Sequence, residues 1–250
     1  MGDLDGVPGD EVAVGDPGGP KGSKNQSGGI FIYHFSAGSF TLAQTLQSPA
    51  AGWVGIGDVT GDSNMDVIAC CGSAGAYVYP GPSLSNPITF SASGRVGAAN
   101  VDGGLYTDLI IGNVASSSTP NGGVYSGLVS AGQQPAFTVT PVTGLDGGWL
   151  NDLDAGDING DGLADIMIGA SNTQPSNACP ANTGTAYVFL TNPATPDQPT
   201  RYVLEAPTPG GGYGWSVAAA AGTRLFFVGE TGRNINGVIN AGQVYVYKVN

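Results

Sequence analysis

An acidic loop of nine residues, DINGDGLAD at 157–165, sets the strongest limit on how this chain can fold. Its oxygen-bearing side chains stand at positions 1, 3, 5 and 9 and are Asp157, Asn159, Asp161 and Asp165. Calcium is held in proteins by about six to eight oxygen ligands, which Asp and Asn supply from a short loop. An EF-hand needs Glu at position 12, where this chain has Ile168. We therefore expect a calcium site outside the EF-hand class, with Leu163 at position 7 as a further ligand.

The same loop recurs with its acids partly kept, and once more, near 219–223, without them. Residues 58–66 (DVTGDSNMD) predict a second calcium site with the ligands Asp58, Thr60, Asp62, Asn64 and Asp66. Residues 100–108 (NVDGGLYTD) have Gly104 at position 5 and predict a weaker site with Asn100, Asp102, Tyr106 and Asp108. Residues 3–11 (DLDGVPGDE) have Val7 there and predict a weaker site with Asp3, Asp5, Gly9 and Glu11. The spacing thus predicts two calcium ions, and up to four.

The formal net charge of −12 is concentrated in these loops, because twelve of the nineteen acidic residues lie in the four that keep acids. Three carboxylates within a few ångströms repel one another unless a cation lies between them. This repulsion favours bound calcium with a structural role, pinning strand one to strand two of each unit. The alternative is that the loops are only tight acidic turns.

Around each loop, short strands recur in a fixed order. After the loop comes an apolar strand that ends near glycine, as in EVAVG (11–15), DVIACC (66–71) and DIMIG (165–169). A glycine-led strand follows, with the aligned aromatic residues Phe31, Tyr77, Tyr125, Tyr187 and Tyr245. No window shows the apolar period of a helix. Four short antiparallel strands per unit form a β-propeller blade. We expect an all-β chain, a single propeller domain or a piece of one, with units at about 1–50, 51–93, 94–145, 146–208 and 209–250.

Two further motifs give the chain a family resemblance. Tyr213-Gly214-Trp215-Ser216-Val217 has the pattern [F/Y]-G-x-S-V, and Gly169-Ala170-Ser171 follows the best acidic loop. Together with that loop they resemble the FG-GAP repeat of integrin α-chain propellers and their bacterial and fungal relatives. The resemblance implies seven blades, calcium beneath the propeller, and a protein or glycan ligand on the opposite face. Because the first unit lacks strand one and the last lacks strand four, we expect a piece of a larger propeller. A divergent five-bladed ring is the alternative.

The composition narrows the class of partner and the compartment. Lys and Arg number seven and do not cluster, so nucleic acid is not an expected partner. No apolar run approaches the roughly 20 residues of a membrane span. Extracellular calcium modules work at dissociation constants of about 10⁻⁴–10⁻³ M, so we expect an extracellular or cell-surface protein. The three cysteines, Cys70, Cys71 and Cys179, leave their pairing open.

All three tryptophans occupy one repeat position, directly after the glycine that opens strand one. They are Trp53, Trp149 and Trp215, and Arg95 takes this position in the third unit. In antiparallel order, the long loops 16–28, 113–122, 171–183 and 230–241 lie on the face opposite the calcium loops, and strand one starts near that face. We expect the tryptophans to pack between blades. The alternative is a stacking platform for a sugar ring or a side chain of a partner, which makes all four candidate ligand-binding residues.

The expected function is that of an adhesion, recognition or assembly module. The alternative is a lectin, similar to fungal propeller lectins, with glycan sites on the loop face or between blades. Catalysis has little support, because the only histidine, His34, has no evident Ser or Cys partner. A carbohydrate-active enzyme is a third class that the fold allows. Asp152 and Asp154, just before the best loop, are either additional calcium ligands or part of a solvated strand, and we expect the solvated strand.

Overall fold

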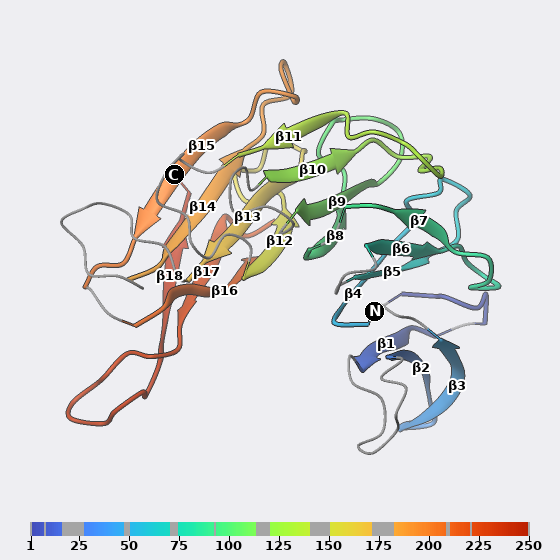
Figure 1. Ribbon diagram of the computed structural model, residues 1–250, viewed down its shortest axis with the longest axis horizontal. Coiled ribbons are helices and arrows are strands. Elements are labelled where there is room, and N and C mark those ends of the chain that lie inside the picture. The colour runs from blue at the N-terminus through green and yellow to red at the C-terminus, as the bar shows by residue number, and fades with distance from the viewer. Residues whose placement is uncertain are drawn as a thin grey trace. The chain divides into compact units, whose positions relative to one another are not determined.

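The computed structural model describes residues 2–7, 9–16, 28–47, 51–70, 75–92, 94–113, 121–140, 151–171, 183–208, 211–220 and 222–249. This part of the chain contains eighteen β-strands and no helix, and the strands form five antiparallel sheets. In each sheet the strands lie side by side in chain order (Figure 1). No helix in the described ranges is long and apolar enough to cross a membrane. The predicted all-β class is therefore confirmed.

Each sheet falls inside one of the five units expected from the sequence. The first contains β1 (Glu11–Asp16), β2 (Gly29–Ser36) and β3 (Ser39–Gln47). The second contains β4 (Trp53–Gly57), β5 (Asp66–Cys70), β6 (Ala76–Tyr79) and β7 (Ile88–Phe90). The third contains β8 (Val96–Ala99), β9 (Asp108–Asn113), β10 (Asn121–Tyr125) and β11 (Phe137–Val139). The fourth contains β12 (Asp152–Gly156), β13 (Asp165–Ala170), β14 (Thr185–Leu190) and β15 (Thr200–Glu205), and the fifth β16 (Tyr213–Ala220), β17 (Leu225–Glu230) and β18 (Gln243–Lys248).

Consecutive strands joined in an antiparallel meander are the blades of a β-propeller. The second, third and fourth sheets have four strands, as the sequence predicts. The first and fifth have three among the described residues, and they lack the strand that the sequence analysis found missing in each. In the first sheet, Gly2 and Glu11 form an isolated antiparallel bridge. This bridge takes the place that the last residue pair between strands one and two has in the other sheets.

The second strand of a blade is buried along its whole length where neighbouring sheets cover both of its faces. Every residue of β5 and β13 is buried. Along β5, Val67 and Ala69 pack in a cluster with Ile30 and Ile32 of the first sheet. Ile68 and Cys70 pack on the other side, with residues of β9. A strand covered on both faces has a continuous apolar run rather than an alternating one, which explains why these segments show no period of two.

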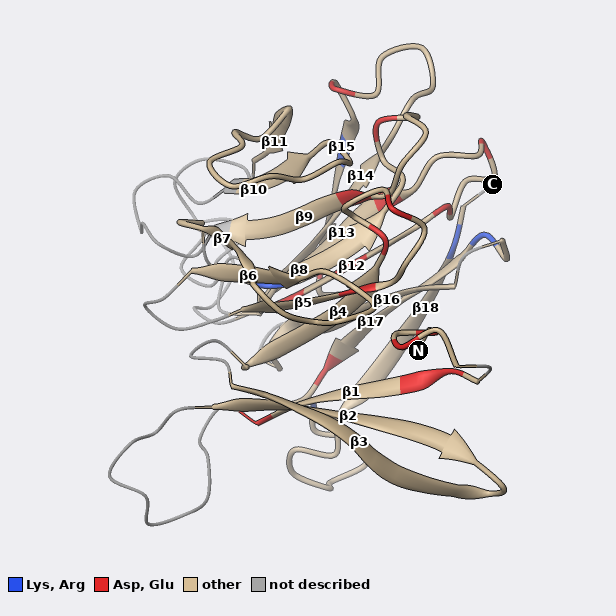
Figure 2. Ribbon diagram, turned by 90° about the vertical axis from the view of Figure 1, so that its right-hand side faces the viewer, with Lys and Arg blue, Asp and Glu red and all other residues tan. Residues whose placement is uncertain are grey.

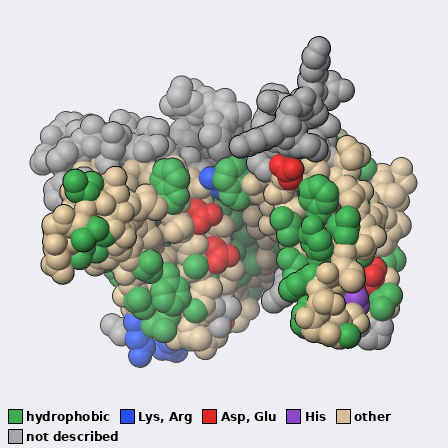
Figure 3. Space-filling view, turned by 90° about the horizontal axis from the view of Figure 1, so that it is seen from below, with side chains coloured by type: hydrophobic (Ala, Val, Ile, Leu, Met, Phe, Trp, Pro, Cys, Tyr) green, Lys and Arg blue, Asp and Glu red, His purple; other side chains and the backbone are tan. Residues whose placement is uncertain are grey.

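Contacts divide the chain into two compact units, each with its own core. The first consists of Met1–Ala98, Gly104–Ile111 and Val124–Pro135, and the clusters around β5 belong to it. The second consists of Ala99–Gly103, Gly112–Gly123 and Ala136–Asn250. Its core is formed between the fourth and fifth sheets, where Met167 and Val188 meet Tyr213 and Phe226. Outer strands leave apolar side chains exposed, such as Phe40 on β3 and Val246 on β18, and Figure 3 shows separate hydrophobic patches of this kind.

A close approach of two main chains explains the Tyr-Gly pair that begins β16. Tyr213 is fully buried, and it forms a parallel bridge with Gly184. Gly214 has a φ of 81°, and a Cβ at this residue would collide with the main-chain oxygen of Thr185. Only glycine adopts this conformation without strain and also leaves the required space. The FG-type motif therefore has a packing role between the fourth and fifth sheets.

Candidate metal centre

The fourth acidic loop connects β12 to β13 and is closed by its own side chains. Asp157 accepts hydrogen bonds from the amides of Gly160 at 2.6 Å and Gly162 at 3.0 Å. Asp161 accepts one from the amide of Leu163 at 2.9 Å, and its other oxygen accepts one from the side-chain amide of Asn159, also at 2.9 Å. Short acidic side chains that bond to the main chain two or more residues on stabilise tight turns. The loop is therefore preformed by the residues that the spacing selects as ligands.

The second acidic loop, between β4 and β5, has the same arrangement. Asp58 accepts from the amides of Gly61 at 2.7 Å and Ser63 at 2.9 Å. Asp62 accepts from the amide of Asn64 at 2.9 Å. Figure 2 shows acidic residues gathered at strand ends and in connecting loops of this kind. Two loops with different sequences thus share one conformation because they share acids at positions 1 and 5.

The acid at position 9 has a different environment, because it is fully buried at the start of strand two. One oxygen of Asp165 accepts from the amide of Ile158 at 3.0 Å, and the other from the amide of Thr191 at 2.8 Å. Asp66 repeats this with the amides of Val59 and Gly81, at 2.9 and 3.0 Å, and also accepts from the hydroxyl of Thr60 at 3.2 Å. Each carboxylate joins the start of its loop to the chain that follows strand three.

Burial leaves the charge of these two carboxylates poorly compensated. Loss of solvation raises the pKa of Asp165 to about 6, although the amides of Thr191 and Ile158 act against the rise. Burial likewise raises the pKa of Asp66, against hydrogen bonds from Gly81, Thr60 and Val59. In the described part of the chain, no ion pair joins the acids of these two loops to a basic side chain. A nearby cation would favour the ionised form of both groups.

The two degenerate loops keep parts of this arrangement. In loop 100–108, Asn100 accepts from the amide of Gly103 at 2.9 Å, and buried Asp108 accepts from the amide of Gly127 at 3.1 Å. Asp102 is half-buried in this loop, and Tyr106 is exposed. In loop 3–11, Asp3 accepts from the amide of Gly6 at 2.7 Å and Asp5 from the amide of Val7 at 2.9 Å. Glu11 is fully buried and accepts from the amide of Leu4 at 2.7 Å, while Gly9 lies beside the ring of His34.

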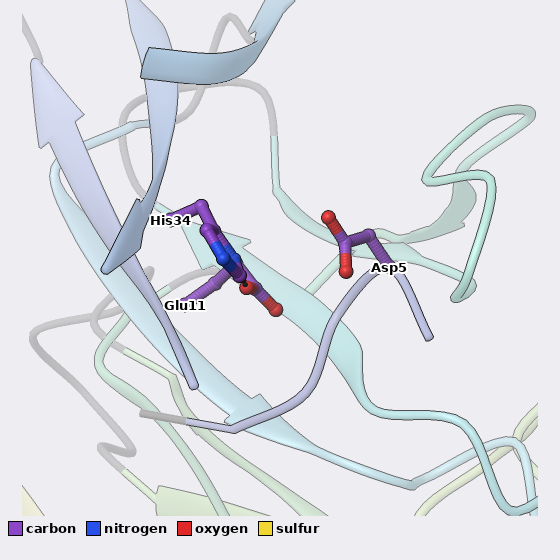
Figure 4. Close-up of side chains that lie close together, drawn as sticks. All are labelled: Asp5, Glu11 and His34. Atoms are coloured by element: carbon purple, nitrogen blue, oxygen red, sulfur yellow. Dashed lines mark hydrogen bonds and ion pairs between the residues drawn. The ribbon is translucent and has the colours of Figure 1, made fainter. Parts of the chain in front are cut away.

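The donor sets of the loops differ in chemistry and in spacing. Loops 58–66 and 157–165 offer only oxygen atoms, the ligand type that calcium requires. Their acids do not converge as a group of three, however. Among the described His, Cys, Asp and Glu residues, three ligand atoms come within 4.8 Å of one another only at Asp5, Glu11 and His34 (Figure 4). The oxygen donors of the two loops thus suit calcium, but their carboxylates are not gathered around one point.

Neighbouring loops of the second compact unit are joined by main-chain hydrogen bonds. The carbonyl of Asn100 accepts from the amide of Ala164 at 2.8 Å. The carbonyl of Asp157 accepts from the amide of Gly222, at 3.1 Å, in the copy without acids. Each bond starts from position 1 of a loop and ends in the next loop along the chain. The conformation of one loop is therefore coupled to that of the next blade.

The tryptophan position lies at the start of strand one and is partly open to solvent. Trp53 is 40% exposed, and the guanidinium of Arg95, which holds the same position in the next sheet, stacks on its indole ring. Trp215 is 52% exposed. Trp149 lies outside the described residues. The contact between Trp53 and Arg95 is one between neighbouring blades, and its cation–π geometry uses the face of the ring.

Asp152 and Asp154, which were expected to be solvated, are half-buried and bond to the neighbouring sheet. Asp152 accepts a hydrogen bond from the amide of Val217 at 3.0 Å, and Asp154 accepts one from the amide of Ala219 at 2.8 Å. Both amides belong to β16, so these carboxylates join β12 to the neighbouring sheet. Acids on alternate positions of strand one can reach the next blade because side chains two residues apart lie on the same face.

Sequence reasoning also missed the partners of the position 9 acids. His34 Nδ1 lies 2.5 Å from an oxygen of Glu11, directly opposite it in the register of β1 and β2. Pairing the two predicted strands residue by residue would have found this contact. The amides of Thr191, Gly81 and Gly127 lie beyond strand three, and no side-chain pattern marks them.

Residues 150–189 match the model of the FG-GAP repeat. This segment begins just before β12 and ends within β14, so it contains the fourth acidic loop and the two strands that hold it. A search of curated proteins found no match to the chain. Residues 150–189 are thus an FG-GAP repeat, and with the five sheets the chain is consistent with a propeller of the integrin-α type.

Proposed function

We propose that this chain is a calcium-stabilised propeller module of an extracellular or cell-surface protein, acting in adhesion, recognition or assembly. The observation that carries the calcium part is Asp165, a fully buried carboxylate that forms no ion pair with a described basic residue and stands at the end of a loop with oxygen ligands. Loop 58–66 repeats the arrangement around Asp66. Loops 100–108 and 3–11 lack the acid at position 5, where they have Gly104 and Val7, so oxygen ligation of calcium is weaker there.

In each of the two loops, calcium would be held by residues of the loop and by the first residue of the strand that follows it. Positions 1, 3 and 5 belong to the loop itself, whereas position 9 is the first residue of strand two. When bound, calcium supplies positive charge next to the buried carboxylate. Asp165 and Asp66 would then remain ionised at neutral pH, and the loop would fasten strand one to strand two. The role proposed for calcium is structural.

Two arguments support the proposed compartment. Cys70 is disulfide-bonded, with a partner that is not among the described residues. Disulfides persist in oxidising environments and are rare in the cytosol. Loops of this kind bind calcium weakly, at dissociation constants of about 10⁻⁴–10⁻³ M in extracellular modules. Both observations support a location outside the cytosol.

A protein partner is proposed to bind on the side opposite the acidic loops. Loops after strand two lie on that side, and the described example joins β17 to β18. Val238 and Ile239 are exposed in this loop, which carries a short turn closed by Ile235 and Val238. Loops on a rigid β-scaffold are frequent sites of binding residues. The proposal assigns no catalytic step to the chain, because its single histidine is engaged with Glu11.

Thermal unfolding with and without calcium tests the proposal. At about 1 mM calcium and a dissociation constant near 10⁻⁴ M, each site contributes about 1.4 kcal/mol. For a chain of this size that corresponds to roughly 3–6 °C in Tm per site. We expect chelation to lower Tm, Asp161→Ala to remove part of the effect, and Asp161→Ala with Asp62→Ala to remove most of it. Asp197→Ala, at an exposed residue outside the loops, is the control. An unchanged Tm on chelation would contradict structural calcium.

A lectin is the second candidate, favoured by the exposure of Trp215. Its indole ring is half open to solvent at the start of strand one, where a sugar ring could stack on it. A glycan array distinguishes the two functions. A lectin would show saturable binding that a monosaccharide competes for and that Trp215→Ala abolishes. Absence of glycan binding by the calcium-loaded chain would leave the protein-binding module as the sole proposal.

A further inference from the structure

The first acidic loop brings together a set of ligand atoms unlike that of the other loops. Asp5 and Glu11 occupy positions 3 and 9, and His34 comes from β2. Ligand atoms of the three residues lie within 4.8 Å of one another. In Figure 4 the carboxylate of Asp5 points toward the pair formed by His34 and Glu11. The group therefore combines one imidazole nitrogen with the oxygens of two carboxylates.

The register of the first sheet places the imidazole there. Glu11 stands directly opposite His34 in the antiparallel pair of β1 and β2. In the fourth sheet Ile166 pairs with Phe189, so the next residue, Leu190, comes opposite Asp165. An aliphatic side chain there leaves the acid to bond with main-chain amides. In the first sheet, a ring nitrogen takes the place of one of those amides.

We propose that Asp5, Glu11 and His34 bind a transition-metal ion of the zinc class, in place of the calcium ion that the loop spacing predicts. Zinc accepts imidazole nitrogen and carboxylate oxygen, with bonds of about 2.0–2.2 Å, whereas calcium uses oxygen ligands. In a tetrahedral site such bonds put ligand atoms about 3.4 Å apart. To reach this spacing, the exposed Asp5 must move in by up to about 1.4 Å from a separation of at most 4.8 Å. The oxygen of Glu11 and Nδ1 of His34, which lie 2.5 Å apart, must separate by about 0.9 Å.

The neighbours of the three residues suit a bound ion. Glu11 is held by the amide of Leu4, so one ligand is oriented before binding. His34 Nδ1 lies 2.5 Å from an oxygen of Glu11, and if that nitrogen takes the metal, the ring must carry its hydrogen on Nε2. Asp5 is exposed, so solvent reaches the group from its side. This site does not depend on calcium in the other loops.

Gly9 gives the ring of His34 its space. A Cβ on Gly9 would stand 3.1 Å from Cε1 of His34, and φ at this residue is 135°. Gly9 also lines an open cavity of about 380 Å³, together with Asp10, Val12, Phe35 and Phe40. The loop spacing predicts Gly9 as a calcium ligand. Its packing against the imidazole instead favours a site built around the ring.

NMR of the histidine ring tests the proposal, because His34 is the only histidine in the chain. The untagged protein, ¹⁵N-labelled and held in 1 mM calcium, is titrated with zinc chloride. We expect one equivalent of zinc to shift the ring nitrogen signals and fix one tautomer. Cobalt(II) should give the visible absorption of a low-coordinate site. Ring signals that do not change at several equivalents of zinc would overturn the proposal.

Matched variants separate this site from the calcium loops. His34→Gln and Asp5→Asn should each weaken zinc binding at least tenfold in calorimetry, while Asp161→Ala should leave it unchanged. Far-UV circular dichroism checks the fold, and Asp5→Asn is the safer variant because Asp5 is exposed. Zinc affinity equal to wild type in both His34→Gln and Asp5→Asn would overturn the proposal. So would displacement of zinc by calcium at millimolar concentration.

Discussion

The buried carboxylate of Asp165 gives a prediction whose size follows from the structure. It is fully buried, and loss of solvation raises its pKa from 3.8 to about 6. At 1.36 kcal/mol per pH unit, this difference corresponds to a free energy of about 3 kcal/mol. Without calcium, the ionised side chain should therefore destabilise the fold at neutral pH.

The direction in which stability changes with pH follows from proton binding by Asp165. A carboxyl whose pKa is higher in the folded than in the unfolded chain binds its proton more tightly when folded. Its stabilising contribution is complete below pH 3.8 and is lost as the pH rises through about 6. The Asp165→Asn variant has no ionisable side chain at residue 165. In chelator, the free energy of unfolding of the wild type relative to the variant should therefore fall by about 2.4 kcal/mol between pH 4 and pH 7.5.

Urea unfolding of both proteins, followed by tryptophan fluorescence at several pH values, measures this difference. With calcium present, the wild type should gain stability at neutral pH relative to Asp165→Asn, because the ion favours the ionised carboxylate. A difference that stays flat with pH in chelator would refute the argument from burial. The same pH dependence with and without calcium would refute the argument that the ion binds beside Asp165.

Three further substitutions test the packing of the blades. Ile168→Ala, in a fully buried position of β13, should cost about 2–5 kcal/mol in urea unfolding, and a loss below 1 kcal/mol would contradict burial on both faces. Asp152→Ala leaves the amide of Val217 without its acceptor and should lower the free energy of unfolding by about 1–3 kcal/mol. The control Asp197→Ala should lower it by almost nothing. Equal effects of the two substitutions would rule out the hydrogen bond between the sheets. Gly214→Ala should lower Tm by several degrees because a Cβ there collides with main chain, and an unchanged melting curve would contradict that close approach.

Local sequence was sufficient to predict the strands and to mark the acids that close the best loops. The run IMIG in β13 is apolar at every position because both faces are covered, and its flanking glycine and acids mark where it ends. Asp157 and Asp161 close their loop with amides only two to five residues away. Interactions of this range are encoded by spacing alone.

Partners far apart in the chain could not be predicted in the same way. Asp152 and Val217 are separated by 65 residues, so nothing near Asp152 in sequence indicates that its carboxylate meets β16. The amide that binds the second oxygen of Asp165 lies 26 residues away, beyond strand three. Loop 3–11 is the clearest case, because its spacing predicts calcium while the strand register brings an imidazole to its last acid.

The sequence by itself determined that the chain is all-β, that its acids are concentrated in repeated loops, and which loops keep the spacing for calcium. Those properties depend on periodicity and on short-range hydrogen bonds, which one sequence displays directly. The tertiary structure decided which acids are buried and which sheet each carboxylate contacts. It also decided that His34 stands beside Glu11, because register and the stacking of blades fix which distant side chains meet.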